Sequence, residues 1–163
     1  MKVYLVRHAI AESSDSQQWP DDGQRPLTSR GERRFTKAAR GIERIVDDVD
    51  VVLSSPHVRA WETAMILHKQ AGWSLPIARL ELTHGTPEVV ADLLREYAFA
   101  GSVAIVGHEP YLSQCIADLV FHHASPGIEM KKGAVACLMF ESVDPMNAEL
   151  AWLLAPRVLL MLA

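Results

Sequence analysis

Two histidines stand at the ends of two similar apolar runs that are about 100 residues apart. His8 comes with Arg7 directly after residues 3–6, and His108 follows Gly107 directly after residues 103–106. A neutral imidazole is a nucleophile near pH 7, and an arginine fork can bind two phosphate oxygens at once. These residue types at the ends of strand-like runs predict a site for a phosphoryl group and the nucleophile that attacks it.

Arg59 adds a second guanidinium to this set, because it comes shortly after a third apolar run at residues 51–53. We expect His8 to be the nucleophile, with Arg7 and Arg59 clamping the equatorial oxygens of the transferring group. His108 is expected to be a second cationic donor to the same oxygens.

The atom that leaves the phosphoryl group also needs a proton, so a general acid is expected nearby. Glu81 and Glu109 are the candidate acids. Three other carboxylates lie in a polar segment early in the chain and are more distant candidates: Asp15, Asp21 and Asp22. His57 and His84 are candidates for the lining and the rim of the same pocket.

These residues need a scaffold that brings strand ends together. The apolar runs predict strands at about 2–6, 50–53 and 103–106, with a short extended piece at 77–82 and two antiparallel closing strands at 134–140 and 150–154. Helical patterns lie between them at about 29–46, 56–71, 87–97 and 110–121. Thr28 and Thr86 are the predicted N-caps, and Gly72 is a predicted helix stop.

The alternation of strand and helix predicts an α/β fold of three layers, α/β/α, with a mostly parallel central sheet and an antiparallel element. In such sheets ligands bind at the C-terminal ends of the strands. The length of 163 residues predicts a single domain over residues 1–163.

Composition narrows the class of protein. The net charge of −4 does not favour nucleic acid, which requires a basic stripe. The chain has two cysteines and no CxxC motif, which fits a reducing cytoplasm. We expect no membrane association, because no apolar run reaches the ~18 residues of a span and the first strand is not a signal peptide. The apolar tail at 158–163 is expected to pack on the body.

A polar segment at residues 11–26 is long for a loop inside a compact domain. It is therefore either functional or mobile, and it could fold over a ligand as a lid.

At this point the motifs resemble those of the histidine phosphatase superfamily, which is phosphoglycerate mutase-like in fold. Val6-Arg7-His8-Ala9 resembles the RHG signature, and residues 54–64 are similar to the SSPxxRAxxTA element. Residues 25–31 match the RPLTxxG segment. Residues 107–113 are similar to the GHEPxLS form of the short members, the SixA-type phosphohistidine phosphatases.

The resemblance implies a role for each matched residue. His8 is the phosphoryl acceptor that becomes a phosphohistidine, and Arg7, Arg59 and His108 hold the phosphate. Glu81 lies near the place where larger relatives have their acid, whereas SixA-type enzymes lack that acid in its usual setting. For Glu109 the backbone N–H at the start of a helix is the expected phosphate donor.

Three positions depart from the family pattern. Ala9 replaces the glycine of the RHG signature, His84 stands where proline is common, and Tyr111 stands where aspartate is common. The last two are expected at the rim of the site, where they bear on the choice of substrate.

The expected activity is that of a metal-independent phosphatase without a cofactor, which works through a covalent phosphohistidine on His8. Its expected substrate is phosphohistidine on a signalling protein, such as a histidine phosphotransfer domain. One alternative is a small phosphate monoester as substrate. Another is a non-catalytic module that binds phosphorylated partners, although a binder has no need of a nucleophile. A mutase is less favoured because the chain is short.

Overall fold

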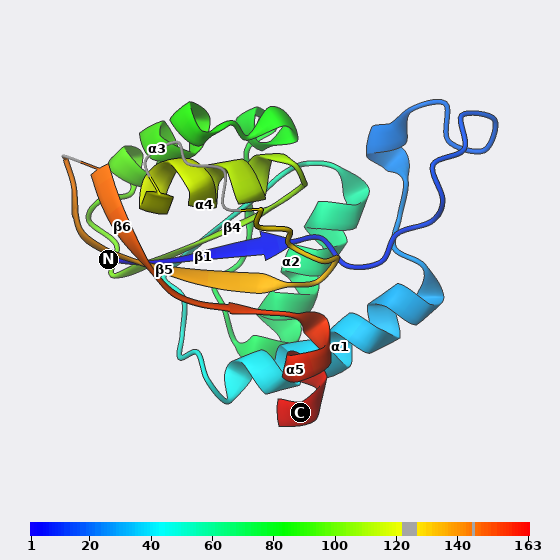
Figure 1. The fold of residues 1–163 in the computed structure, drawn as a ribbon. Coiled ribbons are helices and arrows are strands. Elements are labelled where there is room, and N and C mark those ends of the chain that lie inside the picture. The colour runs from blue at the N-terminus through cyan, green and yellow to red at the C-terminus, as the bar shows by residue number, and fades with distance from the viewer. Residues whose placement is uncertain (122–126, 145) are drawn as a thin grey trace.

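The computed structural model describes residues 1–121, 127–144 and 146–163, and its centre is a mixed β-sheet (Figure 1). The sheet has six strands in the order β3-β2-β4-β1-β5-β6. The strands are β1 Lys2–Arg7, β2 Val51–Ser54, β3 Ile77–Ala78, β4 Ser102–Gly107, β5 Val135–Val143 and β6 Met146–Leu154. The helices are α1 Ser29–Glu43, α2 Val58–Ala71, α3 Pro87–Glu96, α4 Tyr111–Phe121 and α5 Pro156–Leu162, with 3-10 turns at Asp22–Gln24 and Leu80–His84. His122, His123 and Pro145 lie outside the described residues.

The direction of the strands matches the predicted fold class. β1 and β2 both run parallel to β4, and β3 runs parallel to β2. β5 and β6 form the antiparallel part, with β5 beside β1. The predicted α/β fold with a mostly parallel sheet and an antiparallel element is therefore confirmed.

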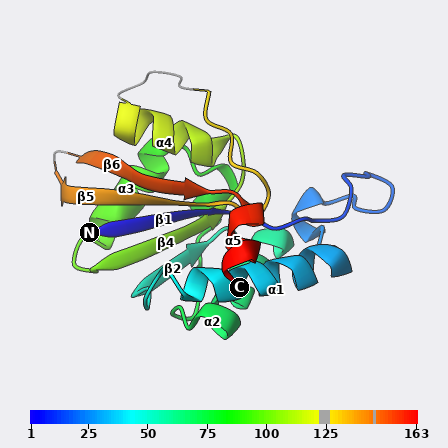
Figure 2. The ribbon, with the colours of Figure 1, turned by 60° about the horizontal axis from the view of Figure 1, so that its bottom comes forward.

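Helices cover both faces of the sheet, which gives the three predicted layers. Figures 1 and 2 show α3 and α4 on one side of the sheet and α1, α2 and α5 on the other. Successive residues of a strand point to opposite faces, so each strand feeds both layers. In β1, for example, Val3 and Leu5 join the core under α3 and α4, whereas Tyr4 and Val6 join the core under α1 and α2.

The start of α1 is fixed against the chain that follows β1. Thr28 caps the helix as predicted, because its hydroxyl accepts a hydrogen bond from the Gly31 N–H at 2.8 Å. Gly31 is required here, since a Cβ at this position would lie 2.0 Å from the Ile10 carbonyl oxygen. The helix N-terminus and the segment after His8 therefore touch through backbone atoms.

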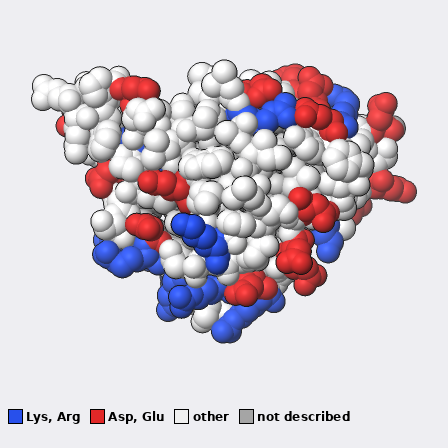
Figure 3. Space-filling model, turned by 180° about the vertical axis from the view of Figure 1, so that it is seen from behind, with Lys and Arg blue, Asp and Glu red and all other residues white. Residues whose placement is uncertain are grey.

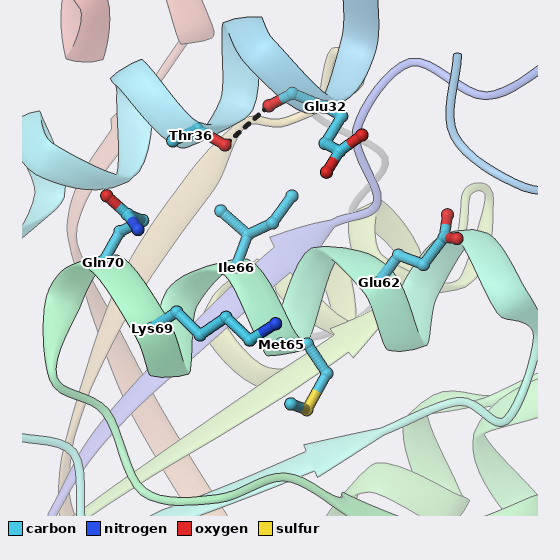
Figure 4. A pocket seen from close by; sticks show the side chains of 7 residues that line it. All are labelled: Glu32, Thr36, Glu62, Met65, Ile66, Lys69 and Gln70. Atoms are coloured by element: carbon cyan, nitrogen blue, oxygen red, sulfur yellow. Dashed lines mark hydrogen bonds between the residues drawn. The ribbon is translucent and has the colours of Figure 1, made fainter. Parts of the chain in front are cut away.

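The other side of this junction is held by α2. Glu62 accepts a hydrogen bond from the Leu27 backbone N–H at 2.8 Å, which ties the end of the 11–26 segment to α2. A hollow of about 260 Å³ separates the outer parts of the two helices. Figure 4 shows Ile66 directed from α2 toward α1 within this hollow, with Glu62 at one end of it.

The C-terminal tail packs on the body, as expected, but it does so as a helix. Leu159 of α5 is fully buried in the core under α1. Gly41 makes the approach possible, because a Cβ there would lie 2.0 Å from the Leu159 carbonyl oxygen.

Two predicted elements differ from the structure. The extended piece expected at 77–82 is a strand only at Ile77–Ala78 and then turns into the 3-10 helix Leu80–His84. This turn places Leu82 in the core and leaves Leu80 exposed. The burial of Leu82 therefore favours a turn over the extended conformation that the sequence pattern predicted. The closing strands are longer than predicted, because the polar residues of β5 and β6 occupy exposed positions beyond the core.

The close contact at Gly41 yields a prediction about stability. Gly41→Ala should lower the free energy of unfolding by about 1–3 kcal/mol, since the added methyl group forces α5 away from α1. Urea unfolding followed by circular dichroism measures this. Gly107→Ala is the matched control, because its Cβ would meet Leu112 at an ordinary 3.6 Å. Equal unfolding midpoints for the two variants would contradict the prediction.

Candidate active site

His8 and His108 lie side by side because β1 and β4 are parallel and in register. Arg7 pairs with Gly107 at the last step of the ladder, and the His8 backbone N–H donates to the Gly107 carbonyl oxygen at 3.0 Å. The next residues of both strands then leave the sheet together. Their imidazole centroids are 5.2 Å apart, and both side chains are buried.

The His8 ring is held in one orientation. Its Nδ1 lies 2.7 Å from the Ala9 carbonyl oxygen, so the Nδ1–H donates to that oxygen and Nε2 carries the free electron pair. Burial, supported by the charges of Arg59 and Arg7, lowers the pKa of His8 to about 3. The ring is therefore neutral at pH 7, which is the form that can attack phosphorus.

The His108 ring is hydrogen-bonded at one of its two nitrogens. Its Nε2 lies 2.9 Å from the Ser55 hydroxyl, and its Nδ1 has no hydrogen-bond partner in the described part of the chain. Burial and the neighbouring His8 lower the pKa of His108 to about 2. Without a bound anion the His108 ring is therefore neutral, and its cationic form in the presence of phosphate stays a prediction.

Arg59 lies on the first turn of α2 and is almost completely buried. Its Nη1 donates to the Asp22 carbonyl oxygen at 2.7 Å, and its Nη2 forms an ion pair with the Asp22 carboxylate at 2.9 Å. Asp22 also pairs with Arg25, and these two guanidiniums hold the pKa of its carboxyl below the usual value. The 11–26 segment therefore lies against Arg59, and its Asp22 carboxylate pairs with the guanidinium that is expected to bind phosphate.

Arg7 is held by the segment that precedes β5. Its Nη1 donates to the Met130 carbonyl oxygen at 2.6 Å, while its Nε has no partner among the described residues. The Gly133 N–H bonds to the carbonyl oxygens of both Arg7 and His8, at 3.1 and 3.0 Å. The segment before β5 thus fixes the backbone that carries the nucleophile.

A single hydroxyl joins the nucleophile to the clamp. Thr63 of α2 accepts from the Ala9 N–H at 3.0 Å and donates to the Arg59 carbonyl oxygen at 2.7 Å. Thr63 is fully buried, so both bonds are shielded from water. Its chemical role could not be read from the sequence, because the two partners are 54 and 4 residues away.

His57 belongs to the site, as the sequence allowed. Its ring centroid is 4.9 Å from that of His108, and its Nδ1 lies 3.2 Å from Arg59 Nη2. Burial and the charge of Arg59 lower the pKa of His57. Two of the three departures from the family pattern, His84 and Tyr111, are in contact, since their rings pack edge to face at 5.9 Å.

The candidate acids bond to residues outside the histidine pair, although Glu109 Oε1 is buried without a partner among the described residues. Glu81 pairs with Arg79 at 3.0 Å, its side chain is 49% exposed, and Arg79 lowers the pKa of its carboxyl. Glu109 accepts from the Ser113 hydroxyl one turn further into α4. Within the described residues neither carboxylate is hydrogen-bonded to His8, Arg59 or His108.

Of the three more distant candidate carboxylates, Asp22 is the one that lies at the site. Asp21 caps the 3-10 turn by accepting from the Gly23 N–H, and Asp15 accepts from the Gln17 N–H.

None of the helices in the described residues combines the length and apolarity that crossing a membrane requires.

The comparisons with known proteins agree with this geometry. Residues 3–84 match the family model of the histidine phosphatase superfamily (branch 1). The chain belongs to the histidine phosphatase superfamily.

Individual relatives support the same fold. The chain is 27% identical over 150 residues to an uncharacterized protein of Picosynechococcus sp., covering 83% of this chain and 82% of that protein. A solved structure of the protein histidine phosphatase SixA complexed with tungstate has a TM-score of 0.83, with 24% identity over 98% of this chain and 99% of the other. The α-ribazole phosphatase from Shigella flexneri has a TM-score of 0.74, with 18% identity over 96% of this chain and 97% of the other.

Two buried neutral histidines should make the stability of this histidine phosphatase depend on pH. The pKa values of His8 and His108 are below 6.5 in the folded state, so the unfolded chain binds more protons as the pH falls below about 6.5. The free energy of unfolding should therefore decrease from about pH 6.5 downward.

Urea unfolding at several pH values measures this effect. The double variant His8→Asn with His108→Asn should lose less stability than the natural chain between about pH 6.5 and pH 4.5. Identical pH profiles for the two proteins would show that these histidines are not the buried neutral groups responsible.

The contact between Asp22 and Arg59 yields a second prediction. Asp22→Asn should bind inorganic phosphate roughly three- to tenfold more tightly, because the half-exposed carboxylate no longer competes for the guanidinium. Isothermal titration calorimetry measures the affinity. Asp21→Asn is the control, since Asp21 caps the adjacent turn without touching Arg59. Unchanged or weaker phosphate binding in Asp22→Asn would count against competition.

Proposed function

We propose that this chain is a phosphohistidine phosphatase that acts through a covalent phosphohistidine on His8. The observation that carries the proposal is the neutral His8 ring, with Nε2 free and with His108, Arg7 and Arg59 around it. The similarity to SixA over almost the full length of both chains supports the choice of substrate class.

The first step transfers the phosphoryl group to the enzyme. His8 Nε2 attacks phosphorus while the P–N bond of the substrate breaks, and the electron pair of that bond stays on the substrate imidazole. This imidazole leaves as a neutral ring if its other nitrogen carries a proton. Arg7 and Arg59 neutralise the equatorial oxygens, and His108 donates a hydrogen bond to them.

The second step releases phosphate by hydrolysis. Phosphorylated His8 keeps its Nδ1–H, because the Ala9 carbonyl oxygen at 2.7 Å accepts it. Water attacks phosphorus, the P–N bond breaks, and His8 leaves as a neutral ring. Both protons of the water remain with the orthophosphate. The ring orientation that exposes Nε2 thus also prepares His8 to be a good leaving group.

The placement of the carboxylates favours phosphohistidine over an ester. An alkoxide leaving group needs a strong general acid, whereas an imidazole has a pKa near 6.5 and needs much less help. Glu81 is paired with Arg79 and Glu109 bonds to Ser113. Among the described residues neither carboxylate is hydrogen-bonded to His8 or His108, and such a site suits a leaving group that is already weakly basic.

A small phosphate monoester is the second candidate substrate. The 11–26 segment lies against Arg59 through Asp22, which is what a lid over a small ligand would do. The similarity to the α-ribazole phosphatase supports this candidate as well.

His8→Ala tests the covalent mechanism. The variant should lose at least about 10³-fold in turnover, because the nucleophile is removed. His8→Gln is a second variant that fills more of the space, and circular dichroism checks the fold of both. Brief incubation of the natural enzyme with a ³²P-labelled substrate should leave acid-labile, alkali-stable label on the protein. Half of the natural turnover in His8→Ala would remove the mechanism.

The same assay should compare a phosphohistidine-bearing phosphotransfer protein with a panel of small monoesters, with and without EDTA. We expect a higher kcat/KM for the protein substrate and no effect of the chelator. A small ester turned over far faster than the protein would retain the nucleophile and replace the substrate.

A further inference from the structure

A groove of about 760 Å³ opens beside Arg7, where the N-terminal turns of α1 and α5 meet the segment before β5. Its lining is strongly cationic. Six of the lining residues are basic: Arg7, Arg30, Arg34, Lys131, Lys132 and Arg157. They face a single carboxylate in the same lining, that of Glu129. This is an unusual concentration of positive charge for a chain whose net charge is −4.

Five of the six cations of this groove are exposed and form no ion pair within the residues that the structure describes. In the described parts of the chain, ion pairs form at Arg25, Arg59, Arg79 and Arg95. None forms at the five exposed cations of the groove, which are Arg30, Arg34, Lys131, Lys132 and Arg157. Their charge is therefore not cancelled locally, and it can attract an anionic surface.

The positive charge continues along α1 beyond the groove. A second hollow, of about 310 Å³, is lined by Arg33, Lys37 and Arg40. Figure 3 shows several Lys and Arg side chains along the lower edge of the rear face, where α1 runs, and separate patches of Asp and Glu on a surface that is mostly uncharged. From Arg30 to Arg40 the helix rises about 15 Å, which is longer than a small phosphate ester.

The groove is also connected to the nucleophile. Arg7 lines the groove and immediately precedes His8, and the positive charge of Lys132 reaches His8, where it helps to lower the pKa of that ring. Gly133, next to Lys132, bonds to the carbonyl oxygens of Arg7 and His8. A macromolecule seated on the groove would therefore lie next to the site where phosphate is removed.

We propose that this basic groove docks an acidic surface that flanks the phosphohistidine of a protein substrate. The proposal rests on the proposed function, because it identifies the kind of protein that presents the phosphate. A protein fits better than a nucleic acid, since none of the described residues that line the groove is an aromatic on which bases could stack. The docking should raise the rate of productive encounter and reject partners with basic surroundings.

The test uses the full chain and reverses two charges of the groove. The variant Arg34→Glu with Lys131→Glu avoids Arg7 and Lys132, which touch or influence His8. Lys2→Glu with Lys69→Glu is the matched control, because it makes the same change of net charge at exposed positions outside the groove. The substrates are a histidine phosphotransfer domain phosphorylated on its histidine and the small compound phosphoimidazole.

We expect the ratio of kcat/KM for the protein to kcat/KM for phosphoimidazole to fall about tenfold or more in the groove variant and less than about twofold in the control. The natural enzyme should lose this preference as NaCl is raised from about 50 to about 500 mM, because salt screens exposed charges. The milder variant Arg34→Gln with Lys131→Gln should have a kcat/KM ratio between those of the control and the charge-reversed variant. It provides a second test if the charge-reversed chain misfolds.

The outcomes separate the two proposals. If the natural enzyme does not dephosphorylate the protein at all, the proposed function fails and the docking proposal falls with it. If it does and the groove variant behaves like the control, only the docking proposal is overturned. Loss of oligonucleotide or anionic-vesicle binding in the groove variant, with the substrate ratio unchanged, would likewise overturn it and assign the groove to another partner.

Discussion

The site depends on the parallel register of β1 with β4. The pairing of Arg7 with Gly107 ends both strands at the same level, so His8 and His108 leave the sheet as neighbours. A shift of one residue would send the two imidazoles to opposite faces, because side chains alternate along a strand. The buried apolar residues of β1 and β4 hold the two strands in this register, and the basic residues of the site follow where the strands end.

Several polar groups of the site are buried without a protein partner, and those that are donors suit a bound anion. Arg7 Nε, Arg59 Nε and His108 Nδ1 all lack a hydrogen bond in the described parts of the chain, and so does the acceptor Oε1 of Glu109, which follows His108 in the sequence. Such groups cost free energy in the absence of a ligand. An anion that accepts from the two arginine Nε–H groups, and from His108 when Nδ1 carries the proton, recovers that cost, and because these donors are already oriented they need no reorganisation during the reaction.

Much of this architecture could be predicted from the sequence, and the failures have physical causes. The apolar runs, the caps at Thr28 and Thr86 and the stop at Gly72 are local signals, and the structure confirms each of them. The placement of Asp22 on Arg59 depends on a contact across 37 residues, which no local pattern reports. Glu81 could be named as a carboxylate near the site, but its pairing with Arg79 depends on the 3-10 turn that replaces the expected extended piece.

The bridge through Thr63 has a consequence for how the molecule can vary. One side chain at this position must accept from one backbone and donate to another, and among residues of this size only a hydroxyl does both. Valine has the same shape but would leave the Ala9 amide without a partner in the dry interior, whereas the Arg59 carbonyl would keep its helical bond within α2. The same hydroxyl links the residue after His8 to the helical turn that carries Arg59, so a substitution at position 63 bears on both halves of the site.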